Sequence, residues 1–233
     1  VYKPSSEPTR NFLGNEIHNL VSDKQGNIFF TSDNVLIHYD LHKEQFSPLQ
    51  RKVNCLHAQG HTVWAATQDS VFKWNPAKKQ FAFVYRLKPS QYITSLYSDT
   101  NDCLWLGTSR GLYRIDNLAT PTPVCVIAEV NVHSLYRDTK GRMWVAAFRQ
   151  GMYKIENGIS QKFVIEKDFA LSNNDVRCFV EDNAGSIWIG TFNGLNKIDT
   201  AGNVSYYKKD TQPGNLKHSS IFSLYKDSQG TIW

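Results

Sequence analysis

Residues 182–188 read DNAGSIW, an acid followed by glycine three positions later and by tryptophan three positions after that. The pattern D-x-x-G-x-x-W returns along the whole chain of 233 residues. Its aromatic residue recurs at intervals of 35 to 45 residues, at Phe29, Trp64, Trp105, Trp144, Trp188 and Trp233. A unit that returns at such a period indicates one structural motif copied in tandem.

The other positions of the motif recur with the aromatic residue. The acid stands six residues before it, at Asp23, Asp99, Asp138, Asp182 and Asp227, and the glycine three before it, at Gly26, Gly141, Gly185 and Gly230. The second copy departs, with Ala58 in the acid's place and its glycine at Gly60. A second block follows each aromatic and reads GLYRID at 111–116, GMYKIE at 151–156 and GLNKID at 194–199, with weaker forms at 35–40 and 70–75.

Each copy divides into four short strands separated by turn signals. In the fifth copy we expect strands at 176–181, 186–191, 195–200 and 203–208. Short connections make neighbouring strands antiparallel, and one such sheet cannot bury either of its faces alone. Stacking successive sheets as blades around an axis solves this problem. The sequence therefore predicts an all-β fold, a β-propeller of four-stranded antiparallel blades.

The copies define the expected domain organisation. Five complete blades are predicted at about 15–50, 51–88, 89–128, 129–168 and 169–212, with half of a sixth at 213–233. Residues 1–14 are expected to be a leader or the outer strand of a preceding blade. We expect the chain to be a piece of a larger propeller of seven blades.

The repeated residues have structural roles in such a blade. Glycine supplies a positive φ in the first hairpin turn, aspartate accepts backbone N–H bonds across that turn, and tryptophan packs against the next blade. We assign these roles to Asp99, Trp105, Asp138, Gly141, Trp144, Asp182, Gly185, Trp188, Asp227 and Gly230. Lone acids such as Glu166 and Glu181 have no visible partner in the sequence.

Composition limits the remaining classes of function. The net charge is +5, but the basic residues are scattered, and Lys73, Arg114, Lys154 and Lys197 share one repeat position that we expect to face solvent. A nucleic-acid-binding protein concentrates its charge on one face, so we expect no nucleic-acid partner. The four cysteines form no C-x-x-C pair, which predicts no metal or redox site and favours small buried side chains. No segment has the run of about 20 apolar residues that spans a bilayer.

The motif D-x-x-G-x-x-W-x-G-T-x-x-G-L-x-x-[IY]-D resembles the two-component regulator propeller repeat. Residues 99–116 and 182–199 match it nearly residue for residue, with Asn101-Asp102 in place of the first glycine in the former. The resemblance runs from about residue 15 to residue 233. The first two copies match the pattern less closely, because they depart from it at Phe29, Val35, Ala58 and Ser70.

This resemblance implies a function. Such repeats build the periplasmic sensor region of hybrid two-component systems, where propellers precede a transmembrane helix and a cytoplasmic histidine kinase. Many members control the use of polysaccharides, and their ectodomains form dimers. The resemblance thus implies a periplasmic, non-catalytic sensor fragment that detects oligosaccharides. It also implies homodimers of the full-length protein, no cofactor, and membrane attachment only through segments outside this chain.

A ligand is expected at the loops between the second and third strands and at the entries to the first strands. Aromatic rings can stack on sugars, while Arg and Asn bond hydroxyls or carboxylates. The fourth copy carries one extra loop residue. The candidate ligand-binding residues are Arg110, Phe148, Arg149, Gln150, Phe192, Asn193, Tyr92 and His133.

Two other functions stay open. One is a propeller glycoside hydrolase or lyase, although the Asp box S-x-D-x-G-x-T-W of sialidases is not matched, and a glycosidase needs a pair of carboxylates across a pocket. The other is a protein–protein scaffold, although the G-H…W-D signature of common scaffolds is missing. We expect no catalytic and no metal-binding residue in this chain.

Overall fold

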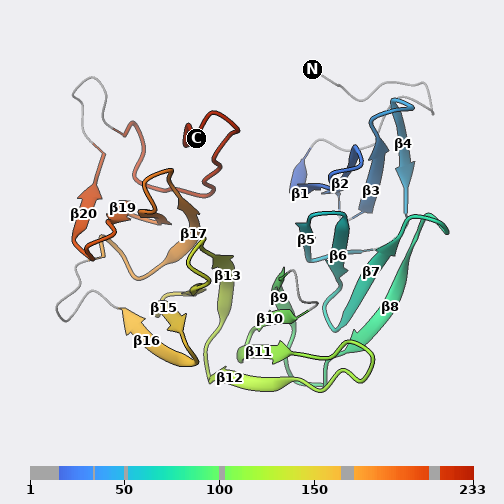
Figure 1. Cartoon of the computed structure of the whole chain (residues 1–233), viewed down its shortest axis with the longest axis horizontal. Coiled ribbons are helices and arrows are strands. Elements are labelled where there is room, and N and C mark those ends of the chain that lie inside the picture. The colour runs from blue at the N-terminus through green and yellow to red at the C-terminus, as the bar shows by residue number, and fades with distance from the viewer. Residues whose placement is uncertain (1–15, 34, 50–51, 100–102, 164–170, 210–215) are drawn as a thin grey trace. The chain divides into compact units, whose positions relative to one another are not determined.

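The structure is a computed structural model that describes residues 16–33, 35–49, 52–99, 103–163, 171–209 and 216–233. These residues form five four-stranded sheets in which the strands follow chain order, and they contain no helix (Figure 1). The predicted all-β architecture of four-stranded antiparallel blades is therefore confirmed. The expected leader at 1–14 and Glu166 lie outside the described residues.

We number the blades in chain order. Blades one to three are formed by β1 (Ile17–Ser22), β2 (Asn27–Ser32), β3 (Val35–Asp40) and β4 (Gln45–Pro48); by β5 (Cys55–Gln59), β6 (Thr62–Ala66), β7 (Ser70–Asn75) and β8 (Gln80–Arg86); and by β9 (Ile93–Ser98), β10 (Leu104–Thr108), β11 (Gly111–Ile115) and β12 (Val124–Ala128). Blades four and five are formed by β13 (Val132–Arg137), β14 (Met143–Ala147), β15 (Gly151–Glu156) and β16 (Ile159–Phe163); and by β17 (Val176–Glu181), β18 (Ile187–Thr191), β19 (Gly194–Ile198) and β20 (Val204–Tyr207).

Part of a sixth repeat follows blade five. Tyr225 and Trp233 exchange two backbone hydrogen bonds there, as the first two strands of a blade do. The described residues group into two compact units, one of residues up to 109 together with 113–126, the other of 110–112 together with 127–233. Within the units, the first strands of consecutive blades pack together, β1 on β5, β5 on β9 and β13 on β17.

The repeat aspartate closes the first hairpin of its blade. In blade five, Oδ1 of Asp182 accepts the backbone N–H groups of Ala184 and Ser186, at 3.0 and 2.8 Å. Its Oδ2 accepts the indole N–H of Trp188 at 2.9 Å. Gly185 has φ +80°, in the left-handed region that glycine adopts without strain. The predicted roles of aspartate and glycine in the turn are confirmed.

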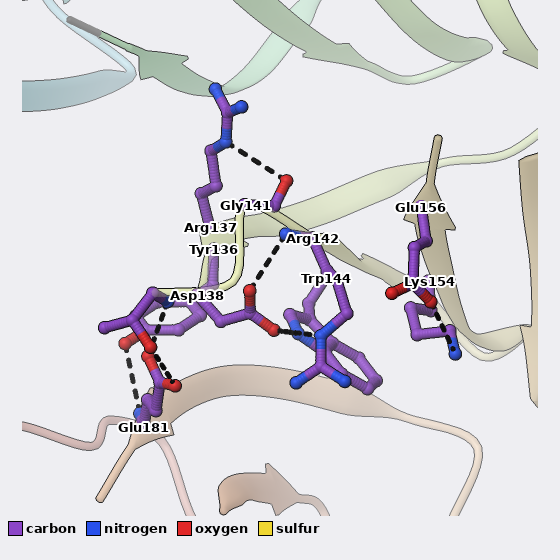
Figure 2. A network of polar contacts seen from close by, with 10 residues as sticks. Tyr136, Arg137, Asp138, Gly141, Arg142, Trp144, Lys154, Glu156 and Glu181 are labelled. Carbon is purple, nitrogen blue, oxygen red and sulfur yellow. Dashed lines mark hydrogen bonds and ion pairs between the residues drawn. The ribbon is translucent and has the colours of Figure 1, made fainter. Parts of the chain in front are cut away.

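The same carboxylate bond to the indole recurs in two other copies. Trp144 donates to Asp138 at 2.8 Å (the side chains lie together in Figure 2), and Trp233 donates to Asp227 at 2.9 Å. The aspartate thus joins the turn to the ring that forms the blade's main packing contact. One residue supplies both functions because one of its oxygens bonds the backbone of the turn and the other bonds the indole.

Tryptophan packs one blade on the next, as predicted. The Trp144 side chain is 2% exposed and lies in a cluster with Phe179, Ile187 and Ile189 of blade five. Trp64 lies likewise in a cluster with Ile93 and other apolar residues of blade three. The rule does not hold equally everywhere, because Trp188 is only half-buried.

The shared basic position is only partly open to solvent. These residues are half-buried, although 41% of the Arg114 side chain is exposed, and several lie over the ring of the paired tryptophan. Lys73 lies 5.1 Å from the centre of the Trp64 ring, and Lys197 lies 4.9 Å from that of Trp188. The repeat therefore retains a cation here because it covers the outer face of the tryptophan.

Glu181 is not the unpartnered acid that the sequence suggested. Its carboxylate accepts the backbone N–H of Thr139 at 2.7 Å and the hydroxyl of Thr139 at 2.6 Å (Figure 2). The hydroxyl of Tyr136 accepts the Glu181 backbone N–H at 3.1 Å. The side chain is 2% exposed, so Glu181 fastens blade five to the first turn of blade four.

Blade two has a shorter first hairpin. In the other blades the aromatic pairs with the residue eight positions earlier, whereas Trp64 pairs with His57, seven positions earlier. The turn that contains Gly60 is one residue shorter, and the position of the repeat aspartate falls on Gln59 and not on Ala58. As a result, the indole N–H of Trp64 has no hydrogen-bond partner.

The cysteines match the expectation only in part. Cys55 is buried, and burial raises the pKa of its thiol to about 12. Cys103 and Cys178 are half-buried and Cys125 is exposed, so the prediction of small buried side chains is wrong for these three. All four are free thiols.

We expect Asp138→Ala to lower the free energy of unfolding by about 2–4 kcal/mol, because it leaves buried donors of Trp144 and Arg142 without their acceptor. Urea denaturation measures this loss. Asp199→Ala is the matched control, since Asp199 closes a similar turn but accepts no indole N–H. A loss as large for the control as for Asp138→Ala would contradict the proposed role of the indole bond.

Stability should also fall in acid. Burial alone would raise the pKa of Asp182, but hydrogen bonds from Trp188 and Ser186, with Lys197 nearby, outweigh it and hold the pKa below the ordinary value. A lowered pKa in the folded state gives stability above the unfolded pKa that is lost as pH falls through the folded pKa. We therefore expect the free energy of unfolding to decrease below about pH 4 and to do so less steeply in Asp182→Asn. Urea denaturation at several pH values checks both, and identical slopes would refute the contribution of Asp182.

Candidate functional site

Loops between the second and third strands lie beside the entries to the first strands, as expected. The Ser109 N–H donates to the Tyr92 carbonyl at 2.9 Å, and the Phe148 N–H donates to the Asn131 carbonyl at 2.8 Å. Such loops also reach the next blade, because the Gly151 N–H donates to the carbonyl of Asn174 at 2.9 Å. We call this end of the blades the loop end.

A β-bulge marks the first strand of most blades at the loop end. One extra residue interrupts the pairing of β9 with β10 at Thr94, of β13 with β14 at His133, and of β17 with β18 at Arg177. All three stand eleven residues before the aromatic of their repeat, and Phe222 occupies that place in the sixth copy. Bulges redirect a side chain and are frequent beside functional sites.

Arg177 is the centre of a cluster at the loop end of the second unit. Its guanidinium lies 5.5 Å from the ring centre of Phe192 and 5.4 Å from that of Phe222. Nη2 of Arg177 also contacts Oδ2 of Asp175 at 3.0 Å. His133 is close enough for the charges of Arg177 and Asp175 to shift its pKa. We call these five residues the arginine cluster.

The cluster combines accessible rings with incompletely bonded polar atoms. Phe192 is 50% exposed and Phe222 is 68% exposed, large values for apolar rings that lie together. Oδ1 of Asp175 and Nε of Arg177 are buried and have no hydrogen-bond partner. Unsatisfied buried polar atoms are few in folded proteins and call for a specific explanation.

The electrostatics of the cluster favour a neutral histidine. Burial of part of the ring, followed by the positive charge of Arg177, lowers the pKa of His133, while Asp175 opposes this shift. The cluster therefore carries one cation and one anion in contact. Such a pair can bond several hydroxyl groups at once, because the guanidinium offers donors and the carboxylate offers acceptors.

The predicted ligand-binding residues are only partly brought together. Phe192 and His133 belong to the arginine cluster, and the neighbouring Asn193 donates its backbone N–H to Thr191. Arg149 lies 5.1 Å from the ring centre of Phe148, in a loop one residue longer than that of blade five. Gln150, in the same loop, is exposed.

Two further candidates lie elsewhere in the chain's loops. Tyr92 belongs to the first unit, where it bonds Ser109 through its main chain. The carbonyl of Arg110 accepts the N–H of Glu129 at 3.0 Å.

Sequence reasoning missed Arg177, Asp175 as its partner, and Phe222. A signal existed, since Arg177 and Phe222 share the repeat position of His133. Alignment of the repeats reveals that these residues share a position. That the position forms a bulge, which redirects the side chain, is seen only in the strand pairing of the structure.

In the first unit, two asparagines near the loop end of the first strands link neighbouring blades. The Asn19 side chain donates to the carbonyl of Asn54 at 3.1 Å, and that of Asn54 donates to the carbonyl of Ile93 at 3.4 Å. These bonds link blade one to blade two and blade two to blade three.

The described residues contain no group of three His, Cys, Asp or Glu side chains placed to hold a metal ion. Within the same ranges, no helix is long and apolar enough to cross a membrane.

We expect Arg177→Met to raise the pKa of His133, because it removes the positive charge that disfavours protonation. Asp175→Asn should lower that pKa, because it removes the opposing negative charge. NMR titration of the histidine ring signals measures both. His38, whose pKa is lowered first by its own burial, serves as the unchanged control. A His133 pKa that responds to neither variant would contradict the cluster's geometry.

Comparison with protein families identifies the repeat. The model of the two-component regulator propeller matches residues 88–110, 127–149 and 170–193. Each match covers a first strand, its hairpin, the tryptophan strand and the loop that follows. No curated protein has significant sequence similarity to the chain.

Solved structures share the fold at low sequence identity. The extracellular domain assigned to the hybrid two-component system BT3049 of B. thetaiotaomicron is 18% identical, with a TM-score of 0.64 over 96% of this chain and 39% of that one. The corresponding domain of BT4673 is 16% identical, with a TM-score of 0.57 over 94% of this chain and 38% of that one.

A streptogramin B lyase is 15% identical, with a TM-score of 0.72 over 99% of this chain and 78% of that one. This chain spans about two fifths of the length of the BT3049 and BT4673 extracellular domains. At these identities the likeness establishes the fold alone. Three stretches of this chain match the two-component regulator propeller repeat, and the chain folds as blades of a β-propeller.

Proposed function

We propose that this chain is a non-catalytic part of the extracytoplasmic sensor region of a hybrid two-component signalling protein, and that it binds oligosaccharides released from polysaccharides. The arginine cluster carries this proposal. The repeat family and the fold shared with extracellular domains of such systems support the setting. We propose further that this region lies in the periplasm and that the full-length protein forms a homodimer.

The chemistry of the cluster suits a sugar. Exposed rings of Phe192 and Phe222 offer flat apolar faces on which the C–H side of a pyranose can pack. Arg177 and Asp175 supply a donor and an acceptor next to these faces. Neighbouring sugar hydroxyls need both kinds of partner.

A catalytic function is less well supported by the side chains. The repeat acids Asp138, Asp182 and Asp227 are engaged in turns, and Glu181 bonds Thr139 of the next blade. Asp175 is the one acid among the described residues of the arginine cluster, and it is paired with arginine. Glycoside hydrolysis by the common mechanisms needs two carboxylates on either side of the bond.

Calorimetric titration of the chain with a panel of plant and host oligosaccharides tests the proposal. We expect at least one member to bind, and Arg177→Ala to weaken it by about tenfold or more, since a lost charged hydrogen bond is worth at least 1.4 kcal/mol. Arg114→Ala is the matched control, because Arg114 also lies over an aromatic ring and pairs with an aspartate, on a strand away from the loop end.

Two results would contradict the proposal. One is the absence of binding across the panel, and the other is equal weakening by both arginine variants. The same samples should show no hydrolysis or elimination products by chromatography. Turnover that disappears on substitution of one carboxylate would replace the sensor function with an enzymatic one.

A further inference from the structure

Blades also meet at the end that carries the first hairpin turns, and two of these junctions differ. Between blades four and five, Glu181 fills the space and bonds Thr139 at 2.7 and 2.6 Å. Between blades two and three, Ser98 stands at the position of Glu181, and Gly60 stands at that of Thr139. The two short residues cannot bridge the junction, so the staple of blades four and five has no equivalent here.

A cavity of about 450 Å³ occupies this junction. It lies within the first unit, and its described lining consists of Lys24, Gln59, Gly60, Thr62, Trp64, Ser98 and Asp99. Its size is in the usual range for pockets that hold small molecules. The lining is mainly polar, with one lysine and one aspartate among these residues.

A buried hydrogen-bond donor lies against the cavity. Trp64 is 1% exposed, and its indole N–H has no partner. In blades four and five a carboxylate accepts the corresponding N–H, that of Asp138 for Trp144 and that of Asp182 for Trp188. By the shared register the Trp64 N–H faces the turn at Gln59, and both this turn and the Trp64 ring line the cavity.

Two charged groups of neighbouring turns face the same cavity. Asp99 accepts the Cys103 N–H at 3.1 Å but not the indole N–H of its own Trp105, which has no partner. Instead, Asp99 lines the cavity together with Lys24 of blade one. A cation and an indole donor favour a carboxylate, while Asp99 favours a donor on the same molecule.

We propose that this cavity, which we call the junction cavity, binds a small molecule that carries a carboxylate and, beside it, a hydrogen-bond donor. The carboxylate pairs with Lys24 and the Trp64 N–H and so replaces the acid that the shortened hairpin lacks. The donor, a hydroxyl or an ammonium group, faces Asp99. Hydroxy acids and α-amino acids share this chemistry. The site is separate from the arginine cluster and does not depend on its function.

The second unit provides a contrast. A cavity of about 300 Å³ there is lined by Arg142, Lys154 and the turn that begins at Asp199. Arg142 is paired with Asp138, Lys154 with Glu156, and Asp199 accepts N–H groups of its own turn. These charged groups already have partners within the protein, so nothing comparable points to a ligand in that cavity.

Calorimetry and NMR of the ¹⁵N-labelled chain test the proposal with three probes. D-glucuronate represents the hydroxy acids, L-serine the amino acids, and D-glucose a neutral polyol. We expect at least one of the two acids to bind and to move the indole N–H signal of Trp64 downfield, with no effect of glucose. The Trp64 signal is identified as the one missing from Trp64→Phe.

Variants test the site itself. Lys24→Met should weaken binding by about tenfold, while Lys140→Met, in the first turn of blade four, should change it by less than about twofold. Ser98→Glu places a carboxylate where Glu181 stands in blade five and should abolish binding. If Ser98→Glu does not fold, Gln59→Asp supplies an internal acceptor for Trp64 and should have the same effect.

The outcomes are distinct. Binding of neither acid, binding of glucose with equal affinity, or an unmoved Trp64 signal on binding would overturn the proposal. Undiminished binding by folded Ser98→Glu or Gln59→Asp would overturn it as well. Oligosaccharide binding at the arginine cluster is tested separately, with Arg177→Ala. Failure of either proposal therefore does not affect the other.

Discussion

The structure depends on one carboxylate that every repeat except that of blade two contains. It holds the first hairpin turn through its backbone bonds and, in three copies, the indole N–H of the tryptophan that packs on the next blade. A turn, a strand and an interface between blades are thereby joined at one side chain. Because the blades are alike, the loss of that carboxylate affects both the hairpin and the neighbouring blade.

Blade two shows what the loss entails. The hairpin is one residue shorter, Gln59 stands where the acid would be, and Trp64 remains packed without a partner for its N–H. The apolar contacts of Trp64 with blade three are sufficient to keep the blade in the stack. The space released at the junction is the cavity that Ser98 leaves unfilled.

The repeat made most of the fold predictable. Fixed offsets in the sequence identify the turn aspartate, the glycine with positive φ and the packed tryptophan, because the aspartate and the glycine act within one turn and the tryptophan recurs at a constant distance from it. Strands of the fifth copy were predicted to within two residues of Val176–Glu181, Ile187–Thr191, Gly194–Ile198 and Val204–Tyr207. Offsets failed at Ala58, since a change in turn length moves every position before it.

The candidate sites were less predictable, because they arise between repeats. Glu181 finds its partner 42 residues away, and Arg177 meets Phe222 of the following copy. Loop composition pointed to the end of the blades where the arginine cluster lies and included Phe192 and His133, but not Arg177, which contacts Phe192. Contacts of this kind depend on how blades stack, which the pattern within one repeat does not contain.

Under the proposed function, the bulges separate ligand recognition from architecture. His133 and Arg177 occupy the extra place in their strands, outside the regular ladder and away from the tryptophan contacts. A residue in such a place can change its chemistry while the hairpin, the turn aspartate and the packed ring remain as they are. A lineage of these proteins could thus acquire new ligands by exchanging one side chain per blade, with the stability of the stack inherited unchanged.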